Sequence, residues 1–475
     1  MNKFKINAIC DINKNALSAT DSFKNIFYLE TSGITNNKIT EIQELFIANI
    51  PSRAQRKVKD KTIIYSTVRP SLKHFGILNN PPLNFIVSTG FVTLDIKIEC
   101  FKKINPVFLY YKLTQNDVTT YLHCVAENSV SSYPSISPSD IGNLIFEFPS
   151  YEIQCGLVKI LTSLDNKIEL NNKINKELEA TAKELYNYWF VQFDFPNKNG
   201  KPYKSSGGKM IWNEKLNREI PNKWKVLSIN DMASNCRGVT YNNLDILPTS
   251  ENGILVLRGN NIKQNNLVFD DNTVYIYKHL VSNEQCIKKH DIILTMSSGS
   301  KEHIGKCVMF QNESPHTFGT FLSKFTPHSD KPYFVFLSML TEYFKQKIHF
   351  ICNGTGINNL TNQTFDELFF AVPDPAILSI FEMQAKVLFE KIGINNLQNE
   401  KLSQLRDFLL PLLMNGQVTV SDEKIETSKP ARLQKTTNRE QRFEQWLNNQ
   451  KIAARGETDL QTFRELFDAM DDDDK

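Results

Sequence analysis

The stretch Asn80–Leu83, with the sequence NPPL, comes nearest of any segment in this chain to a catalytic motif. Enzymes that modify the amino group of a flipped DNA base hold that amine with an Asn-Pro-Pro motif, and an aromatic residue that closes the motif stacks on the base. Leu83 has no ring with which to stack. We therefore interpret the two prolines as a turn rather than a catalytic loop.

Other signatures of catalysis are missing from the sequence. No glycine-rich turn of the FxGxG type, which would hold S-adenosylmethionine, follows a strand-like segment, and no Walker A, HExxH or GxSxG motif occurs. A lone histidine such as His74 or His303 is more often a structural residue or a phosphate contact than a base. The eight cysteines include no CxxC pair, which argues for free thiols and against zinc. We predict that the chain is not an enzyme and holds no metal or cofactor.

The composition is that of a globular protein with room for two or three hydrophobic cores. The chain has 475 residues, and 41% of them are hydrophobic. The longest apolar run, 333–340, is far shorter than the roughly 20 residues of a membrane span, and the N-terminal residues do not resemble a signal peptide. We expect a cytoplasmic protein with no membrane partner. Residues 1–416 hold 45 Lys and Arg against 39 Asp and Glu, a mildly basic balance that permits phosphate contacts.

A long helix with a heptad seam is predicted for residues 151–192, because steps of three and four residues place mostly apolar side chains on one side. A shift of 224 residues gives a second seam of the same kind, so we expect a twin helix over 375–416. Both seams carry polar exceptions at matching places. These exceptions are Asn171, Asn175, Asn395 and Asn399.

The sequence repeats outside the two helices as well. Segments 135–149 and 360–373 both contain a polar turn, an acidic residue, an apolar strand and a closing proline. Farther upstream, YSTVRPSLKHFG, which ends at Gly76, aligns with LTMSSGSKEHIG, which ends at Gly305. The order of the matches is constant although insertions change their offset. The chain is therefore predicted to be an internal repeat of two.

The repeat predicts an α+β fold, of mixed α/β type, with a pseudo-two-fold arrangement. We expect two globular domains separated by two long helices, each with a coiled-coil seam. The predicted parts are a first globular domain (1–150), a central helix (151–192), an exposed linker (193–221), a second globular domain (222–374), a second helix (375–416) and a charged C-terminal tail with short helices (417–475).

The centre of the chain resembles a known family. A long helix ending in LYNYWF is followed by FDFP, by GKPYKSSGGKM, and by Ile220, Pro221 and Trp224. This arrangement is similar to the central region of the specificity (S) subunits of type I restriction-modification systems. The resemblance covers about residues 1–416. Inside the globular domains it is weaker than at the centre.

The resemblance implies a role in DNA recognition. In that family two target-recognition domains each read one half of a split, asymmetric site in double-stranded DNA, and two long helices pack as an antiparallel coiled coil that acts as the spacer. Two methyltransferase (M) subunits, with S-adenosylmethionine as their cofactor, and restriction (R) subunits join the complex. The alternatives are a fused or self-sufficient DNA adenine methyltransferase and a helical scaffold with no DNA role.

Candidate DNA contacts are basic residues in loops, because Arg and Lys reach guanine edges and phosphates. The loops at 69–74 and 298–303 are favoured, since they occupy equivalent places in the repeat. Asn260 and Asn261 are candidates for adenine contacts. The basic candidates are Arg53, Arg56, Lys57, Lys59, Arg69, Lys73, His74, Arg237, Arg258, Lys301 and His303.

The four seam asparagines are candidates for setting the register of the helix pair. If the helices are antiparallel, Asn171 and Asn395 both lie near the middle of the pair, where buried amides could hydrogen-bond and penalise a slipped alignment. The alternative is that they face solvent at the edge of a loose seam. In the tail, apolar residues at helical spacing, such as Trp446 and Phe463, predict two short amphipathic helices, and the final DDDDK matches a protease-tag sequence.

Overall fold

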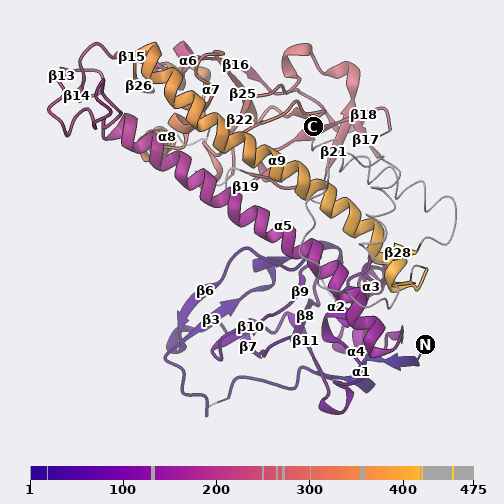
Figure 1. Ribbon diagram of the computed structural model, residues 1–475. Coiled ribbons are helices and arrows are strands. Elements are labelled where there is room, and N and C mark those ends of the chain that lie inside the picture. The colour runs from indigo at the N-terminus through magenta and orange to yellow at the C-terminus, as the bar shows by residue number, and fades with distance from the viewer. Residues whose placement is uncertain are drawn as a thin grey trace, which may run out of the picture. The chain divides into compact units, whose positions relative to one another are not determined.

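The computed structural model describes residues 2–18, 20–129, 134–248, 251–263, 266–269, 273–299, 301–353, 359–417, 419–420 and 452–453. The chain forms two compact units. One comprises Met1–Ile168 with the chain from Glu400 onward, and the other comprises Glu169–Asn399. Each unit therefore holds one globular half and a part of each long helix (Figure 1).

Short strands build the first globular half. They are β1 (Asn2–Lys5), β2 (Cys10–Ile12), β3 (Asn25–Leu29), β4 (Ile34–Thr35), β5 (Lys38–Ile39), β6 (Gln43–Phe46), β7 (Ala54–Lys57), β8 (Ile63–Ser66), β9 (Phe75–Ile77), β10 (Phe85–Ser88), β11 (Phe91–Ile96) and β12 (Ile145–Phe148). One sheet is antiparallel with the order β2-β11-β8-β9. The other has the order β6-β3-β10-β7, in which β3 and β10 are parallel. Strand β1 pairs with β12, directly before the long helix begins.

Helices cover the first of these sheets. They are α1 (Ile6–Ile9), α2 (Pro106–Leu113), α3 (Asn116–Glu127) and α4 (Pro138–Gly142). The α2 helix begins where Asn105 accepts hydrogen bonds from the backbone N–H groups of Val107 and Phe108, and Pro106 pre-sets the first turn. The core between α2, α3 and β8, β9 and β11 also contains Leu161 and Leu409. Both long helices are thus anchored in this core.

The second globular half repeats the first. Its strands are β15 (Lys225–Ser228), β16 (Ala233–Arg237), β17 (Ile246–Leu247), β18 (Gly253–Leu257), β19 (Ile262–Lys263), β20 (Asn266–Leu267), β21 (Val274–Tyr277), β22 (Ile292–Thr295), β23 (Cys307–Met309), β24 (Thr317–Phe318), β25 (Leu322–Pro327) and β26 (Phe369–Val372). Its helices are α6 (Ile229–Met232), α7 (Pro332–Met339) and α8 (Glu342–Asn353).

The connectivity of the second half matches that of the first in most strands. The order β16-β25-β22-β23 corresponds to β2-β11-β8-β9, and β15–β26 corresponds to β1–β12. Strands β18 and β24 are parallel, as β3 and β10 are. The second half adds a β17–β21 pair, whereas the first has β7 beside β10. The predicted α+β class and internal repeat are confirmed.

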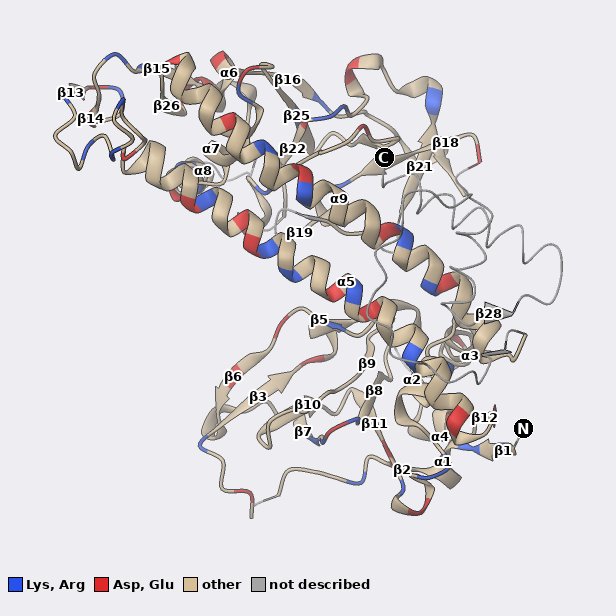
Figure 2. Cartoon of the chain, viewed as in Figure 1, with Lys and Arg blue, Asp and Glu red and all other residues tan. Residues whose placement is uncertain are grey.

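Two long helices follow the globular halves, α5 (Tyr151–Tyr186) and α9 (Pro375–Met414). A π-helical turn, Asn187–Val191, extends α5. In the second unit Trp189 packs on Phe381, with ring centroids 5.9 Å apart. In the first unit Arg406 pairs with Asp165 at 3.0 Å. Later residues of α5 therefore meet earlier residues of α9, as in an antiparallel pair, and charges of both signs lie along the outer faces (Figure 2).

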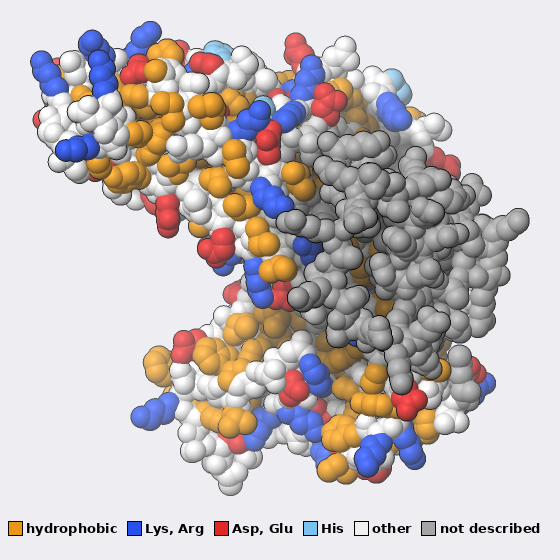
Figure 3. All heavy atoms as spheres, viewed as in Figure 1, with side chains coloured by type: hydrophobic (Ala, Val, Ile, Leu, Met, Phe, Trp, Pro, Cys, Tyr) orange, Lys and Arg blue, Asp and Glu red, His pale blue; other side chains and the backbone are white. Residues whose placement is uncertain are grey.

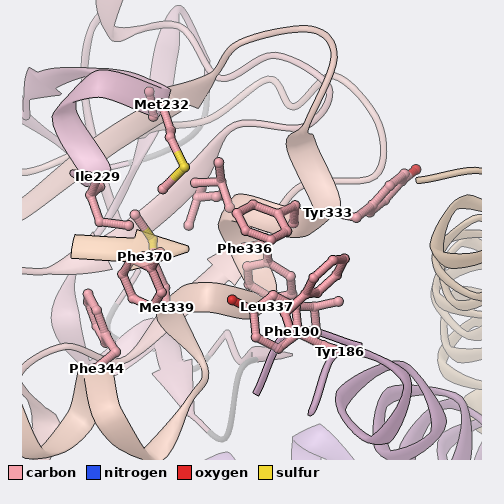
Figure 4. Packing of buried hydrophobic residues seen from close by; sticks show 14 of the residues in the cluster. Tyr186, Phe190, Ile229, Met232, Tyr333, Phe336, Leu337, Met339, Phe344 and Phe370 are labelled. Carbon is pink, nitrogen blue, oxygen red and sulfur yellow. The ribbon is translucent and has the colours of Figure 1, made fainter. Parts of the chain in front are cut away.

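Aromatic residues dominate the core of the second unit. Tyr186 and Phe190, at the end of α5, point toward Leu337 and its neighbours on α7 (Figure 4). The Tyr186 hydroxyl lies 2.9 Å from Oγ of Ser338, so its polar end is satisfied inside the core. This packing connects the end of the long helix directly to the second globular half.

The segment 193–221 was expected to be an exposed linker. In the structure it has regular secondary structure and buried side chains. It contains a hairpin of β13 (Met210–Asn213) and β14 (Arg218–Pro221). Phe193 and Phe195 are buried, and the Phe195 ring stacks on Trp224. The polar residues of the segment are mostly exposed, whereas the apolar ones pack because they adjoin the aromatic core. Lys and Arg side chains gather over β13 and β14 (Figure 3).

Two further predictions concern membrane spans and the C-terminal tail, and the described residues cover only a part of each. None of the described helices has the length and hydropathy that crossing a bilayer requires. The tail helices proposed around Trp446 and Phe463 lie outside the described residues, as does Ser300 in the second candidate loop.

Candidate nucleic-acid interface

Backbone hydrogen bonds gather several loops of the first half into one cluster. The N–H of Thr89, in the turn between β10 and β11, donates to the Arg53 carbonyl at 2.8 Å. The N–H of Thr67 donates to the carbonyl of Gly90 in the same turn at 2.8 Å, and Thr67 in turn accepts from Ile136. The loops that carry Arg53 and Arg69 are therefore held to one common turn.

The Arg69 loop has an unusual backbone. Arg69 and Lys73 both adopt the left-handed conformation, with φ of 47° and 54°, on either side of the short 3₁₀ helix Pro70–Leu72. This conformation is unfavourable for residues with a Cβ and is enriched at functional sites. Pro70 is buried, so the loop is anchored while Arg69 is exposed. The next side chain, His74, points inward, with Nδ1 2.6 Å from the Ile34 carbonyl oxygen.

The other basic candidates of the first half differ in their exposure and in their contacts with other residues of the protein. Arg53 is exposed. Arg56 is half-buried and donates to the Asn13 carbonyl at 3.4 Å, and its burial lowers the pKa of its guanidinium. Lys57 forms an ion pair with Asp21 at 2.6 Å, and Lys59 lies 4.0 Å from the buried Asp95. The structure thus pairs Lys57 and Lys59 with acids of their own domain.

Equivalent hydrogen bonds gather the loops of the second half. Met296 donates to the Phe321 carbonyl at 2.9 Å and accepts from Leu360 at 2.8 Å. These bonds correspond to those that Thr67 makes. The guanidinium of Arg237 donates to the Leu360 carbonyl at 3.0 Å, which places it beside the same cluster.

The remaining candidates of the second half occupy two places. The 3₁₀ helix Lys301–His303 forms the end of the predicted loop 298–303, and His303 is exposed with its Nδ1 2.9 Å from Lys306 Nζ. Arg258 lies at the end of β18, where its backbone N–H donates to Asn261. The amide of Asn261 is buried and also donates to the Val268 carbonyl, so it supports its own loop.

The seam asparagines form a hydrogen-bonded layer between the two long helices, entirely inside the second unit. Asn171 Nδ2 donates to Asn399 Oδ1 at 2.9 Å, and Asn395 Nδ2 donates to Asn175 Oδ1 at 2.7 Å. Asn171, Asn175 and Asn395 are buried, whereas Asn399 is half-buried. The alternative of a loose, solvated seam does not fit these positions.

The layer has a local two-fold symmetry. Under the 224-residue shift, the bond from Asn171 to Asn399 corresponds to the bond from Asn395 to Asn175. A second pair behaves in the same way. It consists of the bond from Asn175 to Asn396 at 2.8 Å and the bond from Asn399 to Asn172 at 2.9 Å. Buried amides that satisfy one another in this way are left unpaired by any shift of one helix along the other.

Chemistry beyond binding has little support among the described residues. They contain no group of three His, Cys, Asp or Glu side chains that could hold a metal. Leu83 of the NPPL turn is 85% exposed and packs into no site. The arrangement therefore offers cationic and polar loops for binding a polyanion, and a hydrogen-bonded helix pair.

Sequence reasoning missed two residues of interest. Phe321 is 66% exposed at the tip of the turn before β25. Its equivalence to Gly90 follows from the strand register, in which Phe91 and Leu322 begin matching strands, and the sequence does not display that register. Glu382 of α9 accepts hydrogen bonds from the N–H groups of Tyr333 and Phe334, at the start of α7. Burial raises its pKa to about 7. A lone glutamate in a helix gives no such signal in sequence.

Comparison with known proteins identifies relatives over most of the chain. The family model described as "Type I restriction modification DNA specificity domain" matches residues 1–180 and 221–404, one match to each half. The HindI specificity subunit of a type I restriction enzyme from Haemophilus influenzae is 25% identical over 466 residues, which cover 88% of this chain and 100% of that protein. The MjaIX specificity subunit from Methanocaldococcus jannaschii is 24% identical and covers 82% of this chain and 87% of that protein. A solved S subunit from M. genitalium aligns with a TM-score of 0.48 and 14% identity over 87% of this chain and 96% of that one.

Proposed function

This chain belongs to the type I restriction modification DNA specificity family, and from that premise we propose that each of its globular halves reads one half of a split DNA site. It is a specificity subunit of a type I restriction-modification system. The two halves carry different side chains on equivalent loops, so the site they read is asymmetric.

The observation that carries this proposal is the duplicated loop cluster. The same backbone bonds join Thr67 to Gly90 in one half and Met296 to Phe321 in the other. Arg53 and Arg69 stand at the first cluster, and Arg237 stands at the second. Loops on a rigid scaffold commonly carry recognition residues, and Arg is the residue that most often contacts guanine edges and phosphates.

The paired helices α5 and α9 serve as the spacer between the two half-sites. A helix of 36 residues, such as α5, is about 54 Å long, which exceeds the roughly 34 Å of one turn of DNA. Flexible linkers would sample many distances, and pairing both half-sites would then cost conformational entropy. The asparagine layer supports a fixed alignment of the two helices and hence a fixed gap.

The chain acts without chemistry of its own and directs other subunits to the DNA. We propose two methyltransferase subunits, which bring S-adenosylmethionine, together with restriction subunits, all in the cytoplasm. No feature of the described residues favours a self-sufficient adenine methyltransferase. A helical scaffold with no DNA role would not account for the two clusters of cationic and polar loops.

The test is methylation by the purified chain with and without methyltransferase subunits. Alone, the chain should bind DNA weakly, with an affinity that falls steeply with salt, and should transfer no methyl group. The complete complex should methylate adenines at one bipartite sequence, which mapping of methylated adenines in genomic DNA would reveal. Methyl transfer by the chain alone, or DNA affinity that does not depend on salt, would contradict the proposal.

A further inference from the structure

The turn that leads into the long core strand differs between the two halves. In the first half, Thr89 and Gly90 connect β10 to β11. In the second half, Thr320 and Phe321 stand in the same two places, directly before β25. Both turns accept the equivalent hydrogen bond, from Thr67 at 2.8 Å or from Met296 at 2.9 Å. The backbone is therefore shared, and the side chain at its tip is not.

The first half has no room for a side chain at this position. A Cβ added to Gly90 would lie 2.7 Å from Cγ2 of Thr31, closer than real Cβ atoms approach. In the second half, 66% of Phe321 is exposed. One half thus presents a phenyl ring at the tip of this turn and the other presents only backbone.

The surroundings of Phe321 set it apart from other exposed apolar residues. Single exposed apolar side chains are common and need no explanation by themselves. The Phe321 carbonyl, however, accepts hydrogen bonds from both Met296 and Ser297, so the residue is fixed to the loop that leads toward His303. The Arg237 guanidinium is held to the same cluster through Leu360. The turn that carries the ring is therefore joined by hydrogen bonds to the loop that leads to His303 and to Arg237.

We propose that Phe321 contacts bases of the half-site that the second half reads. DNA offers apolar surface to a phenyl ring at two places, the C5 methyl of thymine in the major groove and the face of an unstacked base. Contact at either place depends on base identity, whereas phosphate contacts do not. Phe321 is accordingly a specificity-determining residue of one half-site, and the first half reads its own half-site without a ring at the equivalent position. This inference rests on the proposed division of the site between the two halves.

The experiment uses the complete complex with methyltransferase subunits and unmethylated host genomic DNA as the probe. Methylated adenines are mapped for the wild type, F321A and F321L. A matched control is F350A, because Phe350 of α8 is 78% exposed in the same unit but belongs to a different element. Thermal unfolding of each variant checks that it folds.

F321A is expected to slow methylation of the wild-type site by about tenfold or more, since removing an aromatic contact to a base usually has an effect of that size. It should also broaden the base preference at one or two positions of one half-site, with the other half-site unchanged. F321L should retain part of the preference, and F350A should match the wild type.

Two results would overturn the inference. One is that F321A methylates the same sequence as F350A, at the same rate. The other is a loss of rate with base preference unchanged in both half-sites, which would indicate a packing role. A wild-type complex that methylates an undivided site would instead contradict the proposed function, so the two failures are distinguishable.

Discussion

The two globular halves have one scaffold and two different surfaces. Strand order and the backbone bonds of Thr67 and Met296 recur, whereas the position of Gly90 in one half is occupied by Phe321 in the other. A duplicated scaffold with independent loops explains how one chain presents two different recognition surfaces in related positions. The comparison therefore separates residues that hold the fold from residues that are free to vary with the DNA sequence.

The junctions between helix and globular half show a second difference. In the first half, the buried Gln154 of α5 accepts from the Asn105 N–H at 2.9 Å, just before α2. In the second half, Glu382 of α9 accepts from the N–H groups of Tyr333 and Phe334 at the start of α7. The backbone N–H groups at the start of the helix thus donate to a neutral amide in one half and to a titratable acid in the other. Only the second junction should respond to pH.

The largest effect is expected for E382Q. Burial raises the pKa of Glu382 from 4.5 to about 7, so between these values the folded protein holds a proton that the unfolded chain has lost. The resulting stability is fully present below pH 4.5 and is lost as pH rises through 7. At pH 8, E382Q should be the more stable protein, by up to about 3 kcal/mol. At pH 4 the two should be equal.

Urea unfolding at several pH values measures this difference. Q154E is the reciprocal variant, since it should introduce a pH dependence into the first half. If E382Q and the wild type kept the same difference in stability from pH 4 to pH 8, Glu382 would not be the titrating group.

The asparagine layer should show the next largest effect. N395A leaves Asn175 Oδ1 without its 2.7 Å partner and should lower the free energy of unfolding by about 2 kcal/mol. The double variant N175L/N395L replaces both amides with apolar groups, so it should recover the stability and lose the specified alignment. Denaturation measures the first effect. Mapping of methylated sites measures the second, as a spread of gap lengths, and a single sharp gap would show that these amides do not set the alignment.

A smaller effect is expected at the differing turn. G90A forces a Cβ against Thr31 and should destabilise the first half by about 1 kcal/mol, whereas F321A should change stability by no more than about 0.5 kcal/mol. Adding T31S to G90A removes the clashing methyl group and should restore stability. Equal melting temperatures for G90A and the wild type would show that the turn adapts, and the contrast between the halves would lose its steric basis.

The smallest effect is expected from single phosphate contacts. R53A should weaken DNA binding by the complete complex a few-fold, and by the same factor for all DNA sequences. It should also reduce the slope of log affinity against log salt concentration by about one. K3A is the control, because Lys3 is also well exposed but lies on β1 and pairs with Glu147. A change in base preference with R53A would move Arg53 from phosphate contact to base readout.

The sequence predicts the repeated parts of this molecule well, because repetition doubles each weak signal. The recurrence of Asn171 and Asn175 at Asn395 and Asn399 predicted the twin helix, whereas the antiparallel pairing was implied by the family resemblance. Segments that recur in the same order predicted that the two globular halves share one mixed fold. These features depend on local patterns, which a single chain displays twice.

Features that depend on tertiary neighbours could not be predicted. Lys57 was a candidate DNA contact, but its partner Asp21 is distant in sequence and the ion pair forms only in the fold. Phe193 and Phe195 lie in a polar segment, and only the nearby aromatic core explains their burial. The pKa of Glu382 likewise depends on its burial against α7. The base-reading residues remain a prediction for the same reason, since DNA is the missing neighbour.

The central claim is that the paired helices set the distance between two half-sites, and a length change tests it most directly. Four residues inserted after Asn172, and four at the matching place after Asn396, would lengthen both helices by about 6 Å. The methylated site should keep both half-sites, with a gap longer by about one or two base pairs, since each base pair spans about 3.4 Å. An active complex that methylates sites with the original gap would contradict the account.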